Sequence, residues 1–283
     1  MTNSTVKDSV KAVTTALTTH SATPQLDAEL LVAHVLEQDR GWLVAHPDHA
    51  LTPTQLLRVN DLLGKRQSGI PLAYLTGVKE FYGRPFIVTP DVLIPRPDSE
   101  SIIETAIKVL KKNLQPKILE IGTGSGCLAI TLAAELPAAT VVATDVSAAA
   151  IAVAQQNATA LGVANRVTFR VQDLLKGEVG HYDLLVANLP YVPTHWLTDE
   201  NKKQFHLVNE PHVALHGGDD GMDVFTPFFK QFAAHPTSDQ LILEHGDEQS
   251  ASVKKLIDRF LPHATCTVIH DLTGRERGWQ IQL

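Results

Sequence analysis

The strongest constraint on the fold is a regular alternation of short apolar strands with helical segments, which begins at Lys117. Such alternation predicts an α/β fold, with a mostly parallel sheet covered by helices on both faces. We expect strands at 117–121, 140–145, 166–171, 182–187, 240–244, 264–270 and 278–283, and helices at 126–135, 147–161, 222–234 and 248–260. Because only the turn DLTGRERG separates the last two strands, we expect them to pair as an antiparallel hairpin at the sheet edge.

The residues before this alternation differ in character. Residues 1–70 carry apolar side chains at helical spacing, for example Leu26, Leu30 and Leu31, and predict a small helical domain. Residues 71–97 mix aromatic and β-branched residues with glycine and proline, which predicts a β-hairpin linker. The remaining residues, 98–283, form the α/β domain. For the helical domain, a folding cap and a module that docks a partner both fit the pattern.

The composition narrows the possible partners and the compartment. The chain has 24 Lys and Arg against 31 Asp and Glu, a formal net charge of −7. Proteins that grip nucleic acid usually present a basic surface, so this balance disfavours DNA or RNA as the main partner. No apolar run approaches the about 20 residues of a membrane span, and the N-terminus lacks the pattern of a secretory signal. Two cysteines in unrelated contexts, without an HExxH or CxxC pattern, favour a cytoplasmic protein with no metal site.

The segment ILEIGTGSG, residues 118–126, predicts a cofactor site. A buried strand runs into Gly122, Gly124 and Gly126, and ligands of open α/β sheets bind at the carboxyl ends of strands. A dinucleotide site more often shows GxGxxG. Here Glu120 precedes the glycines and would repel a pyrophosphate. The same carboxylate can balance the cationic end of S-adenosyl-L-methionine, which has no phosphate.

Further candidate cofactor contacts follow the next two strands. Asp145 ends the strand TVVATD, where a carboxylate can accept both ribose hydroxyl protons. Asp173 and Leu174 end the third strand, where an adenine would lie. The acids Glu120, Asp145 and Asp173 lie at three successive strand ends. This pattern argues against the alternative that the glycine loop is only a structural turn. The expected cofactor-binding set is Glu120, Gly122, Thr123, Gly124, Ser125, Gly126, Asp145, Asp173, Leu174 and Asn188.

A second candidate group, Asn188-Leu189-Pro190-Tyr191, directly follows the buried strand YDLLVAN. A carboxamide nitrogen is a poor nucleophile because its lone pair is delocalised into the carbonyl. Acceptors for its two N–H groups can hold it in line with a sulfonium methyl, which is catalysis by positioning. The Asn188 oxygen and a neighbouring backbone carbonyl could accept these bonds, and Tyr191 could pack flat against the planar amide.

We therefore expect Asn188, Pro190 and Tyr191 to be catalytic, and these residues with Leu189 to bind the substrate. The plainer alternative is that Asn188 caps a turn and Tyr191 fills core.

Together these motifs resemble the amino-methyltransferases that modify planar exocyclic or amide nitrogens. The segments PLAYLTGVKEFYGRPF, VLIPRPDSE, NEPHVALHGGDDG and DLTGRERG narrow the resemblance, over nearly the whole chain, to the bacterial HemK/PrmC family. The resemblance implies a Rossmann-like, seven-stranded class I methyltransferase sheet. It also implies methyl transfer from S-adenosyl-L-methionine to the side-chain amide nitrogen of the glutamine in the Gly-Gly-Gln motif of peptide chain release factors. The helical domain 1–70 would then help to recognise these partners.

One residue departs from the family motif. The family usually has Asn-Pro-Pro-Tyr, and this chain has Leu189 at the first proline. The resemblance implies that this position acts through its backbone carbonyl, which leucine also has, although the loop loses the fixed φ of proline. Asn-Leu-Pro-Tyr is also similar to the motif of ribosomal RNA adenine dimethylases, so an adenine-N6 methyltransferase acting on RNA or DNA is the enzymatic alternative. A catalytically inactive binding homologue is the non-enzymatic one, against which the retained Asn188, Pro190 and Tyr191 weigh.

Several neighbouring residues have simpler explanations. Asp98 or Ser99 can cap the helix that follows the prolines. Arg96, between two prolines, is expected to pin the linker rather than reach the active-site mouth. Glu210-Pro211 and the segment 216–221 are expected to shape the wall opposite Asn188, and Arg277 can form a salt bridge within the terminal hairpin.

Overall fold

The computed structural model describes residues 4–197, 207 and 209–283, and the chain divides into two compact units, Met1–Val78 and Lys79–Leu283. The first unit is helical. Its helices are α1 (Val6–Leu17), α2 (Pro24–Leu36), α3 (Arg40–Ala45), α4 (Pro53–Gln67) and α5 (Leu72–Thr76). Threonines cap α1 and α4 with capping boxes, and proline opens α4.

A buried ion pair crosses the apolar core of the helical unit. Arg66 of α4 and Asp27 of α2 lie 2.8 Å apart, and both side chains are about as buried as the surrounding leucines. A charge buried in this way is tolerated because its partner compensates it. The pair therefore ties α2 to α4 within the unit.

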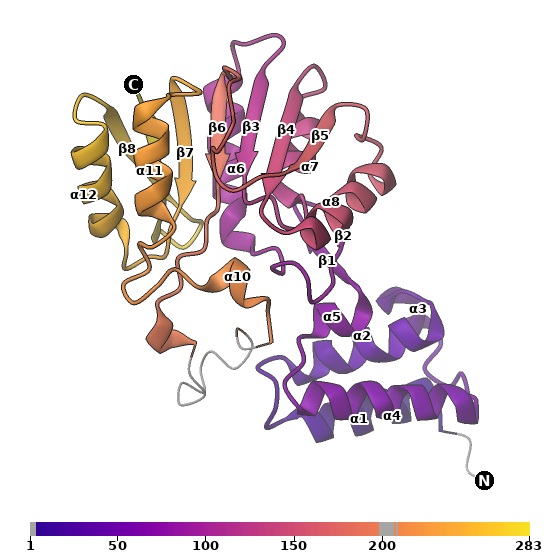
Figure 1. Cartoon of the computed structure of the whole chain (residues 1–283). Helices are drawn as coiled ribbons and strands as arrows, with labels where there is room; N and C mark the ends of the chain where they lie inside the picture. Colours follow the sequence, from indigo (N-terminus) through magenta and orange to yellow (C-terminus); the bar gives the residue numbers. More distant parts are fainter. Residues whose placement is uncertain (1–3, 198–206, 208) are drawn as a thin grey trace. The chain divides into compact units, whose positions relative to one another are not determined.

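The second unit begins with a hairpin, β1 (Val78–Phe81) and β2 (Arg84–Ile87), and then builds a seven-stranded sheet. The sheet strands are β3 (Lys117–Ile121), β4 (Thr140–Asp145), β5 (Val167–Val171), β6 (Leu184–Ala187), β7 (Gln240–Glu244), β8 (Thr265–His270) and β9 (Glu276–Gln282). Their order is β5-β4-β3-β6-β7-β9-β8 (Figure 1). The first five strands are parallel, and β9 runs antiparallel to β7 and β8, which confirms the predicted edge hairpin.

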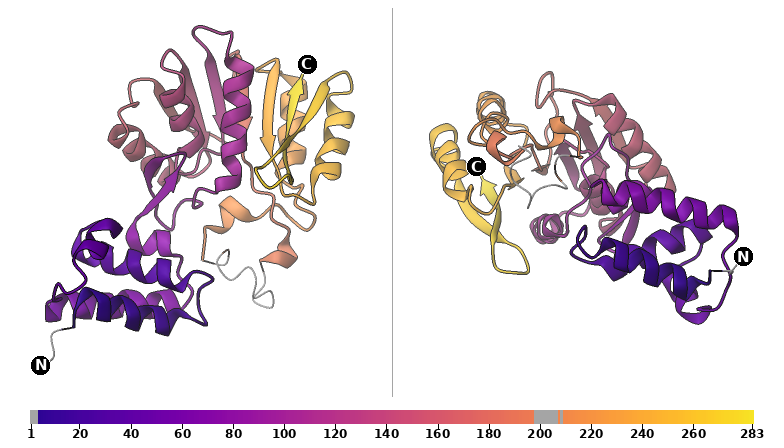
Figure 2. Two further views of the ribbon diagram at one scale, coloured as in Figure 1. Left: turned by 180° about the vertical axis from the view of Figure 1, so that it is seen from behind. Right: turned by 90° about the horizontal axis from the view of Figure 1, so that it is seen from below.

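Helices cover both faces of this sheet, as the alternation predicts. Those of the second unit are η1 (Pro97–Ser99), α6 (Glu100–Leu110), α7 (Cys127–Glu135), α8 (Ala148–Ala160), η2 (Thr194–Trp196), α10 (His212–Leu215), α11 (Phe225–Ala234) and α12 (Ser250–Phe260). The opposite views in Figures 1 and 2 show α6 on one face and α11 and α12 on the other. Ile118 and Leu119 of β3 belong to separate apolar clusters on these two faces, because successive strand residues point to opposite sides.

Asn157 of α8 joins the hairpin to the loop after β3. Its side-chain oxygen accepts from the Ile87 N–H at 2.7 Å, and its amide donates to the carbonyls of Ile87 and Ser125 at 2.9 Å. A fully buried carboxamide needs partners of this kind. Within the described ranges, no helix has the length and apolar character that crossing a membrane requires.

Candidate active site

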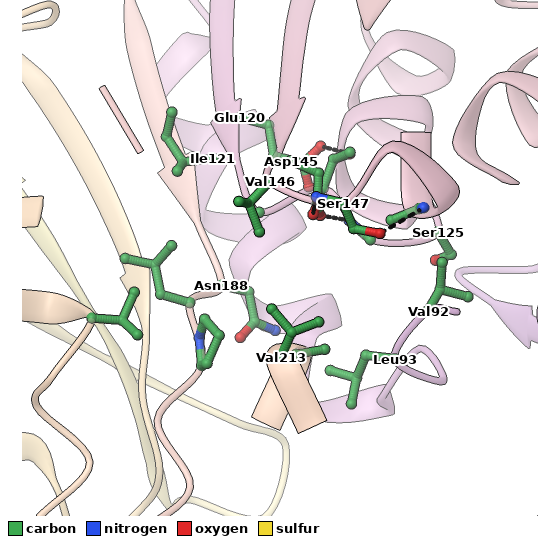
Figure 3. A pocket seen from close by; sticks show the side chains of 18 of the residues that line it. Val92, Leu93, Glu120, Ile121, Ser125, Asp145, Val146, Ser147, Asn188 and Val213 are labelled. Carbon is green, nitrogen blue, oxygen red and sulfur yellow. Dashed lines mark hydrogen bonds between the residues drawn. The ribbon is translucent and has the colours of Figure 1, made fainter. Parts of the chain in front are cut away.

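A cavity of about 300 Å³ opens where β3, β4 and β6 end (Figure 3). Most of the residues expected from the sequence line it together: Glu120, Gly122, Thr123, Gly124, Ser125, Asp145, Asp173, Leu174, Asn188, Leu189 and Pro190. Gly126 and Tyr191 are not among the lining residues. The carboxyl ends of neighbouring parallel strands meet at one sheet edge, which is why groups far apart in the sequence converge here.

The glycine loop after β3 is held in an unusual backbone conformation. Gly122, Gly124 and Gly126 all have positive φ, at 75°, 53° and 81°. A Cβ at Gly124 would meet nothing within 4 Å, so this residue leaves open space beside the cavity.

Gly126 is constrained by packing. A Cβ there would lie 2.7 Å from Ile130 Cδ1 and 3.1 Å from Ala154 Cβ, so only glycine fits between α7 and α8 at this position.

Glu120 is buried and braces the loop from beneath. Its Oε2 accepts hydrogen bonds from the Thr123 hydroxyl and, at 3.2 Å, from the Ala129 N–H in α7. Burial raises the pKa of the Glu120 carboxyl to about 8, against the lowering effect of these two bonds. The carboxyl lines the cavity as expected, but it also holds the loop to the start of α7, which the sequence motif alone does not indicate.

Asp145, at the end of β4, faces the cavity and secures the same loop. One carboxylate oxygen accepts from the Gly124 N–H and the other from the Ser147 N–H, each at 2.9 Å. Burial raises the pKa of Asp145, and these backbone bonds oppose the rise. Figure 3 shows Asp145 and Glu120 on one side of the cavity and Asn188 on the other.

Two residues after β5 form the rim of the cavity. Asp173 is half-exposed and pairs with Lys176 at 2.5 Å, so its carboxylate is solvated rather than enclosed. Leu174 has a φ of 50°, a conformation uncommon for a residue other than glycine. The side chain of Gln172 donates to the Leu174 carbonyl at 2.9 Å and also lines the cavity, a contribution that the sequence analysis missed.

Asn188, directly after β6, turns its side chain to the cavity (Figure 3). Its Nδ2 donates to the Ser99 hydroxyl oxygen at 3.4 Å. Ser99 makes no capping bond with its side chain, so the expected cap at this serine is wrong. Leu189 is 2% exposed, and its side chain belongs to the apolar cluster around α11.

Tyr191 does not present its ring to the cavity. Its hydroxyl donates to Oε1 of Glu244, at the end of β7, at 3.3 Å. Its carbonyl accepts from the side chain of Gln249 at 2.7 Å. Burial, with Glu244 nearby, raises the pKa of the Tyr191 phenol. The expectation that Tyr191 packs flat against a substrate amide therefore finds no support in the geometry, because the ring lies behind the cavity wall.

The glycines of segment 216–221 explain how Tyr191 is held there. A Cβ on Gly217 would lie 2.8 Å from Tyr191 Cα, and one on Gly221 would lie 2.4 Å from the Tyr191 carbonyl oxygen. Contacts this short exclude any side chain at both positions. The segment thus encloses the Tyr191 backbone, whereas the cavity wall near Asn188 comes from Val213, which the sequence analysis did not single out (Figure 3).

Two arginines anchor the segment that precedes α6. Arg96 pairs with the buried Glu210, which also accepts from the Ile94 N–H at 3.0 Å. Arg96 therefore pins this segment to the approach to α10, and it lines the cavity as well. Arg277 pairs with Asp271 and with Asp98, each at 2.9 Å, so the predicted bridge within the terminal hairpin is confirmed and extended.

Across residues 4–197, 207 and 209–283, no group of three or more His, Cys, Asp or Glu is arranged to hold a metal ion. Cys127 lines the cavity, but burial raises the pKa of its thiol to about 12. The thiol is therefore protonated and a weak nucleophile at neutral pH.

Comparison with known proteins covers both units. Two family models match: the PrmC N-terminal domain over residues 9–77 and the methyltransferase small domain over residues 99–216. The release factor glutamine methyltransferase of Koribacter versatilis is 40% identical over 215 residues, 75% of each chain. The enzyme of the same name from Xylella fastidiosa (strain Temecula1) is 38% identical, over 89% of this chain and 91% of its own length. That of Bordetella pertussis is also 38% identical, over 90% of this chain and 93% of its own length.

A solved structure supports the fold. The hMettl16 catalytic domain, in complex with the MAT2A 3'UTR hairpin 6, matches with a TM-score of 0.58 at 15% identity, over 76% of this chain and 80% of that one. At this identity the likeness concerns the fold alone.

Proposed function

Since the chain belongs to the release factor glutamine methyltransferase family, we propose that it transfers a methyl group from S-adenosyl-L-methionine to the side-chain amide nitrogen of the glutamine in the Gly-Gly-Gln motif of peptide chain release factors. The observation that carries the proposal is the placement of Asn188 across one cavity from the glycine loop and Asp145. This arrangement can hold an amide group beside a nucleoside cofactor. The reaction would take place in the cytoplasm, where release factors act.

The residues of the cavity fit the cofactor. Asp145 offers a carboxylate for the ribose hydroxyls, and Gly124 leaves open space next to it. The Ser125 hydroxyl is buried and has no hydrogen-bond partner among the described residues, so it can bond a polar group of a ligand. Glu120 would face the cationic amino acid end, and Asp173 and Leu174 the adenine. When bound, S-adenosyl-L-methionine supplies a methyl group on a positively charged sulfur, which is electrophilic.

Asn188 and Leu189 would position the acceptor nitrogen. The Asn188 side-chain oxygen and the Leu189 backbone carbonyl accept the two N–H bonds of the glutamine amide, and Pro190 fixes the turn that presents them. Groups held in place before the reaction act without reorganising during it. The nitrogen loses one proton as it gains the methyl group. Because an N-protonated amide is strongly acidic, water suffices to accept that proton and no strong base is required.

The helical domain, residues 1–70, would recognise the protein substrate, with 71–97 as the connecting hairpin segment and 98–283 as the catalytic domain. Every candidate cofactor contact lies in the second unit, from Glu120 onward. A helical unit with its own core is therefore free to serve another purpose. Docking of the release factor is the purpose that we propose for this unit, which the PrmC N-terminal domain model matches over residues 9–77.

The proposal is tested by methyl transfer from labelled cofactor to purified release factor and, in parallel, to RNA. Asn188→Ala should lower the single-turnover rate on release factor by about two orders of magnitude or more, the scale of losing one preorganised polar group. Cofactor affinity, measured by calorimetry, should change little. The matched control is Asn113→Ala, which removes an exposed carboxamide outside the cavity. Labelling of RNA alone, or a folded Asn188→Ala enzyme with a near-normal rate, would overturn the proposal.

A further inference from the structure

The backbone that follows Asn188 has few anchors of its own. Strand β6 ends at Ala187, and residues 188–191 belong to no strand or helix. Among the described residues, no hydrogen bond between backbone groups involves 189–191, and such bonds resume only at Val192, whose N–H donates to the Leu215 carbonyl at 2.8 Å. The conformation of this turn therefore depends on contacts that side chains make with it.

Gln249, directly before α12, makes such a contact. Its Nε2 donates to the Tyr191 carbonyl at 2.7 Å, and its Oε1 accepts from the Gly246 N–H at 3.1 Å. The two bonds fix which end of the Gln249 amide faces Tyr191, because the reversed side chain would set oxygen against oxygen and NH2 against N–H. In the part of the chain that the structure describes, this is the one hydrogen bond to the backbone of residues 189–191.

The surroundings leave room for this bond and add a second hold on the same residue. A Cβ on Gly221 would lie 2.1 Å from Gln249 Nε2 and 2.4 Å from the Tyr191 carbonyl oxygen, so any side chain at this position would displace one of the two partners. The Tyr191 hydroxyl donates to Glu244, the last residue of β7, at 3.3 Å. Segment 244–249 thus holds Tyr191 at its hydroxyl and at its carbonyl.

We propose that Gln249 is a positioning residue for methyl transfer, which holds the turn that offers the Asn188 oxygen and the Leu189 carbonyl to the substrate amide; this rests on the function proposed above. Leu189 lies between the end of β6 and Tyr191. Pro190 has a fixed φ, which limits how far the Leu189 carbonyl can turn independently of Tyr191. Neither Gln249 nor Tyr191 is among the residues that line the cavity, so Gln249 acts through the turn.

The first test replaces the donor and keeps the acceptor. Gln249→Glu preserves the length of the side chain and the bond to the Gly246 N–H, but a carboxylate oxygen then faces the Tyr191 carbonyl and cannot donate to it. In the full chain, the single-turnover rate on release factor should fall by about 10- to 100-fold, the effect of a displacement of about 1 Å near the reacting groups. The KM for release factor and the calorimetric affinity for S-adenosyl-L-methionine should stay close to those of the wild type.

A control variant carries the same change of charge elsewhere. The side-chain oxygen of Gln231 also accepts a backbone N–H, from Leu175 at 3.0 Å, and Gln231 lies outside the cavity. Gln231→Glu should therefore leave the rate unchanged. A wild-type rate for folded Gln249→Glu would overturn the inference.

The second test separates positioning from stability. Gln249→Met has a side chain of similar length that makes neither bond, so it should unfold at a lower urea concentration than Gln249→Glu, whose negative charge also suits the N-terminus of α12. If Gln249 positions the turn, Gln249→Glu is nevertheless at least as slow as Gln249→Met. If Gln249 only stabilises the fold, the rates follow the stabilities, and a clearly faster Gln249→Glu would refute the inference.

A third readout does not depend on any substrate. The chain has four tyrosines, and only Tyr191 is followed by a valine. Isotopic labelling of tyrosine carbonyl carbons and valine nitrogens therefore gives a single NMR correlation, from the peptide that joins Tyr191 to Val192. Its carbonyl signal should shift in Gln249→Glu and in Gln249→Met, which lose the bond, and stay in place in Gln231→Glu.

This signal also distinguishes the inference from the proposed function. An unmoved carbonyl signal in Gln249→Glu refutes the hold of Gln249 on the turn even if release factor proves not to be the substrate. Conversely, a shifted signal in a protein whose wild type methylates no release factor would sink the proposed function and leave the role of Gln249 in holding the turn established.

Discussion

Asp145→Ala removes a carboxylate that we expect to hold the ribose of the cofactor. In the structure this carboxylate already accepts two backbone N–H bonds, from Gly124 and Ser147, each at 2.9 Å. The variant therefore loses a ligand contact and two supports of the glycine loop. Hydrogen bonds to a charged group are worth about 1.5–3 kcal/mol each. Loss of one such contact to ribose corresponds to binding weakened by about 10- to 150-fold.

The loss of fold stability should be smaller than two such bonds suggest. Burial raises the pKa of Asp145, so the ionised carboxylate is partly destabilised in the folded chain, and its removal relieves that penalty. We expect a decrease of about 1–3 kcal/mol in the free energy of unfolding. Asp145→Asn keeps one acceptor oxygen and should lie between wild type and Asp145→Ala in both measurements.

Calorimetric titration with S-adenosyl-L-methionine measures the affinity, and urea titration measures the stability. Asp258→Ala serves as control, because Asp258 is an exposed acid on α12 that pairs with Lys254 and lies outside the cavity. If folded Asp145→Ala protein binds the cofactor as tightly as wild type does, Asp145 does not hold the ribose and the carboxylate only supports the loop.

Three further results are expected. Burial raises the pKa of Glu120 to about 8 and of Glu244 to about 7, so these two carboxyls bind more protons in the folded chain than in the unfolded chain between about pH 5 and 8. The free energy of unfolding should therefore fall as pH rises through this window. In urea titrations, Glu244→Gln should flatten the part of this fall that lies below about pH 7. Arg66→Ala leaves the buried Asp27 unpaired and should lower the free energy of unfolding of the helical unit by about 3–5 kcal/mol without changing cofactor affinity. Removal of residues 1–78 should leave cofactor binding intact and impair methylation of whole release factor, whereas unimpaired methylation would make the unit a folding cap.

The sheet and most of the cavity were predictable because their signals are local. A run of apolar and buried residues such as 118–121, followed by glycines and a helical pattern, specifies a strand, a turn and a helix with no knowledge of the rest of the chain. Asp145 and Asn188 could be placed at the same edge because parallel strands align their carboxyl ends.

The residues behind the cavity wall were not predictable in the same way. Tyr191 and Glu244 are 53 residues apart in the sequence, and they meet only because β7 pairs with β6. Strand pairing between distant segments leaves no trace in either segment alone. For the same reason, an aromatic residue after Asn188 could equally face a substrate or the interior, and the hydrogen bond from the Tyr191 hydroxyl to Glu244 holds the ring away from the cavity.

Leu189 is the residue where the sequence and the structure lead to different expectations for one substitution. From the motif alone, Leu189→Pro restores the family residue and should keep the methylation rate within about tenfold, provided that only the backbone carbonyl is used. In the structure, however, the leucine side chain is buried, and its Cδ2 would lie 3.6 Å from a Cβ on Gly122. A change of shape there should lower the free energy of unfolding by about 1–3 kcal/mol.

The two effects separate when Leu189→Pro is compared with Leu189→Ala. Alanine removes the packing and leaves φ free, whereas proline removes packing and fixes φ. If the carbonyl alone matters, both folded variants should methylate release factor within about tenfold of wild type while both unfold at lower urea concentration. A folded Leu189→Pro protein that loses far more activity than Leu189→Ala would mean that the turn must move, or that its N–H is used, during the reaction. In that case the backbone carbonyl cannot be the whole contribution of this position, and leucine is required here for more than packing.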